Sequence, residues 1–117
     1  MKVSIYHNTR CSKSRQTLQL IRDRGIEPGI IEYLRDPPDA GTLREILAML
    51  GIGARDLLRT GESEYRELAL DQDDLDDDRL IEAMVGHPKL IQRPIVVVGD
   101  AARIRRPPER VLEILDR

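Results

Sequence analysis

The hydrophobic and polar residues in the first third of the chain follow two different periods. Residues 3–6 are rich in strand-forming side chains, which predicts a short strand, and a polar loop comes after them. Residues 12–24 carry apolar side chains at helical spacing, and Gly25 stands where a glycine commonly follows a helix. Residues 30–34 predict a second strand that ends before a pair of prolines. This part of the chain therefore has the order β-α-β.

The middle of the chain has the period of helices. Four apolar residues recur at positions i, i+3, i+4 and i+7, the stripe of an amphipathic helix: Leu43, Ile46, Leu47 and Leu50. Asp39 or Thr42 can cap the start of this helix, and Gly51 ends it. Short helical turns are predicted at residues 56–58 and 64–70. A second apolar face predicts a further helix: Leu80, Ile81, Met84 and Val85.

The last third of the chain returns to strands. Residues 94–98 form a continuous run that is mostly β-branched, which is typical of a buried strand. A glycine and an aspartate then predict a turn, and residues 101–105 can pair back as a hairpin. Pro107 and Pro108 begin a final helix. This part therefore has the order β-β-α.

The complete order of elements is β-α-β, a helical block, and β-β-α. This order predicts an α/β, thioredoxin-like fold with a helical insertion between its two halves. A chain of 117 residues is long enough for one domain. We therefore expect a single domain over residues 1–117, with the insertion at about residues 39–86.

Composition excludes several classes of function. The net charge of −2 lacks the basic excess of a nucleic-acid-binding protein, and the absence of Trp and Phe argues against stacking of bases or sugars on aromatic rings. No apolar run is long enough to span a membrane, and no secretory segment is recognisable at the N-terminus. One cysteine and two histidines are too few for a Cys-rich zinc site, so no metal is expected. The single thiol favours a cytoplasmic protein.

Cys11 is the main candidate for chemistry because it lies between the first predicted strand and the first predicted helix. Unpaired N–H groups at a helix N-terminus stabilise a thiolate, which lowers the pKa of the cysteine. The Ser14 hydroxyl could donate a hydrogen bond to the sulfur, and His7 could tune the thiolate. Since position 14 is serine, the chain has no Cys-x-x-Cys pair, so turnover requires an external thiol. The alternative for Cys11 is a small buried hydrophobic residue.

Three arginines are candidates for binding an oxyanion, because each lies at the end of a predicted element beside Gly or Pro: Arg59, Arg93 and Arg106. The guanidinium fork keeps its charge and donates two parallel hydrogen bonds to an oxyanion. Arginine is common in this chain, so the alternative for each of the three is a solvated surface residue.

Several segments together resemble the glutaredoxin-dependent arsenate reductase family, in particular its short subgroup with Cys-Ser-Lys-Ser-Arg. The opening signature is Ile5-Tyr6-His7-Asn8-x-x-Cys11-x-x-Ser14-Arg15. The later blocks are Tyr33-Leu34-x-x-Pro37-Pro38, Leu57-Leu58-Arg59, Arg93-Pro94-Ile95-Val96-Val97 and Arg103-Ile104-x-Arg106-Pro107. The resemblance extends from residue 3 to about residue 115.

The resemblance implies a fold, a reaction and a set of roles. It implies a thioredoxin-like enzyme in which Cys11 attacks arsenate and Arg59, Arg93 and Arg106 hold the oxyanion. It also implies that His7 and Ser14 help to keep the cysteine ionised and that the peptide bond before Pro94 is cis. No cofactor is expected to be bound. Glutathione would be the co-substrate, and glutaredoxin would complete the reduction to arsenite, in the setting of arsenical resistance.

Two other functions fit the same fold. One is a glutathione-dependent thiol reductase or transferase that acts on another substrate. The other is a regulator of the Spx type, which binds RNA polymerase and in many members switches through a Cys-x-x-Cys pair. Ser14 removes that pair and all three candidate arginines are present, which favours the arsenate reductase.

Overall fold

A computed structural model describes residues 2–104 of the chain. These residues form two compact units, one made of residues 2–36 with 93–104 and the other of Pro37–Gln92. Among the described residues, no helix combines the length and apolar character that crossing a membrane requires. The helical insertion predicted at about 39–86 lies within the second unit. The single domain over residues 1–117 stays a prediction.

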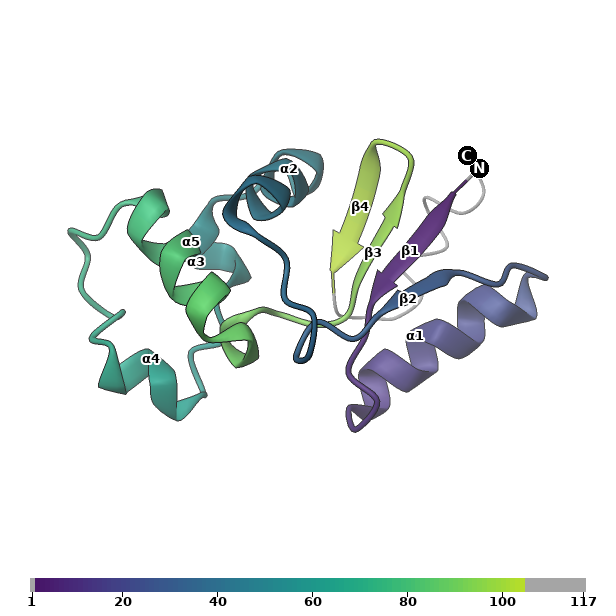
Figure 1. The fold of residues 1–117 in the computed structure, drawn as a ribbon, viewed down its shortest axis with the longest axis horizontal. Helices are drawn as coiled ribbons and strands as arrows, with labels where there is room; N and C mark the ends of the chain where they lie inside the picture. Colours follow the sequence, from purple (N-terminus) through teal and green to yellow (C-terminus); the bar gives the residue numbers. More distant parts are fainter. Residues whose placement is uncertain (1, 105–117) are drawn as a thin grey trace. The chain divides into compact units, whose positions relative to one another are not determined.

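The first unit is a four-stranded sheet with one long helix (Figure 1). Its strands are β1 (Val3–Tyr6), β2 (Gly29–Ile31), β3 (Ile95–Val98) and β4 (Ala101–Ile104), in the order β2-β1-β3-β4. The helix α1 (Ser12–Asp23) connects β1 to β2, which are parallel, whereas the other pairs of neighbouring strands are antiparallel. The β1–β3 pairing joins two segments that are far apart in the sequence.

The buried cluster between α1 and the sheet is aliphatic, and the first unit also buries Tyr33. Val3 and Ile5 point to the same face of β1 because side chains alternate along a strand. Leu18 and Ile21 lie one turn apart on α1 and cover that face. The buried cluster is completed from the hairpin and includes Val96, Val98 and Ala101. Packing of α1 on the sheet therefore fixes the end of β1 and the start of α1 relative to each other.

The second unit is helical. It contains α2 (Ala40–Leu50), α3 (Ala54–Leu57), α4 (Ser63–Glu67), α5 (Asp77–Gly86) and the short 3-10 helix η1 (Pro88–Leu90). α5 contacts α2, α3 and η1. Of the two predicted caps of α2, the structure uses Asp39, whose side chain accepts the Thr42 N–H at 2.8 Å. Gly51 ends α2 in the left-handed region, as predicted, with φ +69°.

The predicted α/β fold with a helical insertion is confirmed, with small changes at the edges. β2 covers Gly29–Ile31 rather than residues 30–34, because residues 32–36 form a turn in which the Arg35 and Asp36 N–H groups both donate to the Glu32 carbonyl at 2.9 Å. The final helix predicted after Pro107 lies outside the described residues.

Candidate active site

The loop between β1 and α1 is held by its own backbone and by the neighbouring strand. The His7 N–H donates to the Ile31 carbonyl at 2.8 Å, which continues the pairing of β1 with β2. The Asn8 carbonyl accepts the Cys11 N–H at 3.0 Å, and Asn8 Oδ1 accepts the Arg10 N–H at 3.0 Å. Asparagine commonly closes tight loops by such a bond to the backbone two residues on. The loop therefore holds Cys11 at the start of α1.

Cys11 is the N-cap residue of α1, with extended backbone angles of φ −94° and ψ 121°, and its side chain is half-buried. Burial alone raises the pKa of the Cys11 thiol, but a hydrogen bond from the Ser14 backbone N–H and the charge of Arg93 lower it. The backbone N–H of Lys13 and a hydrogen bond from Arg93 lower it further. The net result is a pKa below the ordinary cysteine value of 9.0, so the site favours the thiolate.

Arg93 lies directly before β3 and supplies the positive charge beside Cys11. The peptide bond between Arg93 and Pro94 is cis, the isomer that the resemblance implied. Arg93 Nε is buried and lacks a hydrogen-bond partner within residues 2–104. A buried N–H without an acceptor is costly in free energy, and an anionic oxygen beside Cys11 would satisfy it. This geometry is compatible with an oxyanion bound by Arg93 next to Cys11.

His7 and Ser14 form a buried pair next to this loop. His7 is 5% exposed and Ser14 is completely buried. His7 Nδ1 lies 2.6 Å from Ser14 Oγ, and Ser14 Oγ also accepts the Asn8 N–H at 3.1 Å. The hydroxyl that the sequence offered to the sulfur therefore has His7 and Asn8 as its partners. The Ser14 group that lowers the pKa of the Cys11 thiol is its backbone N–H.

Burial also sets the protonation of His7, because it lowers the pKa of the imidazole below its ordinary value of 6.5. The charge of Glu32 opposes this shift, while the charges of Arg22 and Arg15 add to it. His7 is therefore neutral at pH 7. A neutral imidazole either accepts from or donates to the Ser14 hydroxyl at Nδ1, according to which ring nitrogen carries the proton.

The other two candidate arginines have different surroundings. Arg59 belongs to the second unit, where its Nη1 lies 2.6 Å from Glu62 Oε1 and its backbone N–H donates to the Leu90 carbonyl at 2.8 Å. Arg106 lies outside the described residues. The structure therefore brings together Cys11, Arg93, His7 and Ser14, the last two as a pair, and the roles of Arg59 and Arg106 stay predictions.

Sequence reasoning gave no structural role to two residues that shape the site. Asn8 closes the loop through both its backbone and its side chain. Its position between a strand and a helix was the available signal, because asparagine favours such turns. The charge of Glu32, which follows β2 directly, raises the pKa of His7. No local sequence pattern predicts this effect, because it arises from the parallel pairing of β2 with β1.

The described residues around Cys11 suit nucleophilic chemistry. Within residues 2–104, no group of three or more His, Cys, Asp and Glu side chains could hold a metal ion. Within the described part of the chain, the site instead combines a thiol of lowered pKa at a helix N-terminus with a guanidinium whose Nε has no hydrogen-bond partner. This combination can attack an electrophilic centre that carries anionic oxygens.

The sequence model of the ArsC family matches residues 6–114 of this chain. The chain belongs to the ArsC family. The match includes all the residues of the site described above. It also includes Arg59 and Arg106.

Individual known proteins are similar to nearly the whole of this chain. A protein of Escherichia coli K12 named uncharacterized protein YfgD is 54% identical, and the alignment covers 97% of each chain. An arsenate reductase of the same strain is 50% identical over 97% of this chain and 80% of its own length. The structure of an arsenate reductase from Vibrio cholerae superposes with a TM-score of 0.94 at 50% identity, covering 97% of this chain and 98% of that one. The ArsC-type, thioredoxin-like fold of the chain is thereby established.

Proposed function

We propose that this protein is an arsenate reductase whose nucleophile is the Cys11 thiolate. The observation that carries the proposal is the Arg93 guanidinium, which lowers the pKa of Cys11 and whose buried Nε has no partner among residues 2–104. Arsenate is a tetrahedral oxyanion, so its oxygens can accept from Arg93 while its arsenic is attacked by sulfur. The related arsenate reductases support this choice of substrate.

In the first step, the Cys11 sulfur forms a bond to arsenic and one arsenate oxygen leaves as water after taking up protons. Arsenic stays at oxidation state V, so no electrons are transferred at this stage. Charge accumulates on the remaining oxygens, where a fixed cation stabilises it best. We propose Arg93 in this role, together with Arg59 and Arg106 on the strength of the family resemblance.

The electrons must come from outside the chain, because reduction to arsenite takes two electrons and Cys11 is the single cysteine. We propose that the thiol of glutathione displaces a second oxygen as water and forms its own sulfur–arsenic bond. A glutaredoxin thiolate then attacks the glutathione sulfur, and the electron pair of that sulfur–arsenic bond passes to arsenic. The two external sulfurs leave as a mixed disulfide, and water releases arsenite from Cys11. The reducing thiols favour a cytoplasmic location.

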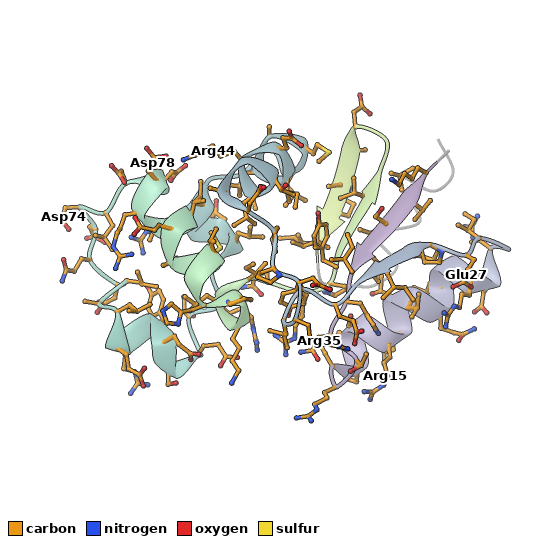
Figure 2. All side chains as sticks on the ribbon, viewed as in Figure 1. Arg15, Glu27, Arg35, Arg44, Asp74 and Asp78 are labelled. Atoms are coloured by element: carbon orange, nitrogen blue, oxygen red, sulfur yellow. The ribbon has the colours of Figure 1, made fainter. Side chains whose placement is uncertain are left out.

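The test is arsenate-dependent NADPH oxidation in a mixture of the protein, glutathione, glutaredoxin and glutathione reductase. The wild-type protein should turn over, and Cys11→Ser should lose turnover while keeping its fold by circular dichroism. Arg44→Gln is the matched control, because Arg44 is an exposed arginine of the second unit paired with Asp78 at 2.9 Å (Figure 2). Reduction of a glutathionylated peptide without any response to arsenate would overturn the proposal in favour of a thiol reductase.

A further inference from the structure

A cavity of about 270 Å³ opens beside the loop that carries Cys11. Loop residues 7–10 form one wall, and Glu32, Leu34 and Arg35 form the other. Both walls belong to the first unit, and the hydrogen bond from the His7 N–H to the carbonyl before Glu32 ties them together. The volume is close to the lower end of the range for small-molecule sites, roughly 300 Å³.

The lining of this cavity contains residues of both charges, with more basic than acidic side chains. The residues that line it include two arginines, Arg10 and Arg35, and one glutamate, Glu32. Arg35 Nη1 lies 3.5 Å from Glu32 Oε2, with the side chains 79% and 43% exposed, so this ion pair is weak. A ligand can therefore replace this ion pair and interact with Arg35 and Glu32 instead. The guanidinium of Arg15, labelled in Figure 2, donates to the Thr9 carbonyl in the loop wall at 2.8 Å.

Two cations and one anion complement a peptide that has two carboxylates and one ammonium group. The cavity wall ends one residue from the nucleophile, because Arg10 precedes Cys11 and consecutive Cα atoms are about 3.8 Å apart. An extended tripeptide spans about 10 Å, so a thiol on its middle residue can reach the neighbourhood of the sulfur. Arg93 is not available for these carboxylates when its donors hold the oxyanion, which makes a separate set of cations necessary.

We propose that this cavity is the binding site of the external thiol, with the carboxylates of a glutathione-type peptide on Arg10 and Arg35 and its ammonium on Glu32. This inference rests on the proposed function, because it assigns a binding site to the external thiol that the proposed reaction requires. The binding itself needs no reaction, so it can be measured separately from turnover.

The test uses S-methylglutathione, which has the charges of glutathione and no free thiol. Its dissociation constant is measured by titration calorimetry for the wild type, Arg35→Gln, Glu32→Gln and the control Arg44→Gln. We expect binding to weaken at least fivefold in the first two variants and to stay unchanged in the control. Cys11→Ser should bind like the wild type. Equal binding by the wild type and both cavity variants, or no binding at millimolar peptide, would overturn the inference.

Turnover separates this inference from the proposed function. In a protein that reduces arsenate, both cavity variants should raise the KM for glutathione and leave the KM for arsenate unchanged. His7 stays neutral in Glu32→Gln, because Glu32 acts to raise the pKa of His7. Normal turnover with unchanged KM for glutathione would overturn the inference alone. Absence of arsenate reduction, with peptide binding that depends on Arg35 and Glu32, would overturn the proposed function alone.

Discussion

The charge state of one sulfur atom depends on residues from two distant parts of the sequence. The start of α1 supplies the Lys13 and Ser14 backbone N–H groups, and the segment before β3 supplies Arg93. These donors outweigh the effect of burial, which by itself favours the neutral thiol. Of the donors, only Arg93 can be removed without changing the backbone.

Replacing Arg93 with Gln should therefore raise the pKa of the Cys11 thiol. The pH profile of Cys11 alkylation by iodoacetamide measures this shift, and it should move to higher pH than in the wild type. Arsenate turnover should fall about 100-fold, the usual loss for one donor to a developing oxyanion. Arg44→Gln should change neither measurement. An unchanged alkylation profile in Arg93→Gln would show that Arg93 does not act on the sulfur.

Ser14→Ala separates the two roles of this residue. The substitution keeps the backbone N–H that lowers the pKa of Cys11 and removes the hydroxyl that contacts His7 Nδ1 and accepts the Asn8 N–H. We expect stability to fall by roughly 1–3 kcal/mol, because buried polar groups lose their partner. The alkylation profile of Cys11 should move little. A large shift with unchanged stability to urea would instead indicate a direct bond from the hydroxyl to the sulfur.

At the scale of elements, particular residues mark where helices begin and end, and most of these residues can be recognised in the sequence. The apolar stripe of α2, its Asp39 cap and its final Gly51 follow from spacing and residue type. The early end of β2 does not follow from the sequence, because the turn that begins at Glu32 is held by backbone hydrogen bonds, which the spacing of apolar residues does not reveal. The same limit applies to the site, where the partners of the Ser14 hydroxyl arise from tertiary packing and not from helical spacing.

Two glycines offer a direct test of this account of helix ends. Gly51 has φ +69°, where a Cβ is strained even though no atom lies within 4 Å, so Gly51→Ala should destabilise the protein by about 1–2 kcal/mol. Gly86 is the last residue of α5, and it has no positive φ and open space around it. Gly86→Ala should therefore stabilise by about 0.5–1 kcal/mol. Urea unfolding measures both, and equal effects of the same sign would contradict the explanation.

At the scale of the whole molecule, the sheet that supports the thiol is built from both ends of the described chain. Val3 pairs with Val98 and Tyr6 with Ile95, so the first unit forms only when segments on either side of the helical insertion meet. Long-range pairing of this kind is slow to form. The order of elements could be predicted from the sequence because apolar residues recur with different periods in strands and in helices. The position of Arg93 beside Cys11 depends on this pairing, and only the family resemblance indicated it.

The overall stability should depend on pH through two groups of this unit. The pKa of His7 is below 6.5 because burial disfavours the charged imidazole, so the unfolded chain binds more protons and stability falls as the pH drops below 6.5. The pKa of Cys11 is below 9.0, so its contribution is complete above 9.0 and is lost as the pH falls through the lowered value. Urea unfolding at a series of pH values above about 5, where carboxylates stay ionised, should show stability rising through both ranges. His7→Gln should remove the acidic part of this dependence and Cys11→Ser the alkaline part. A wild-type stability that increases on acidification below 6.5 would contradict the assignment of a buried, neutral His7.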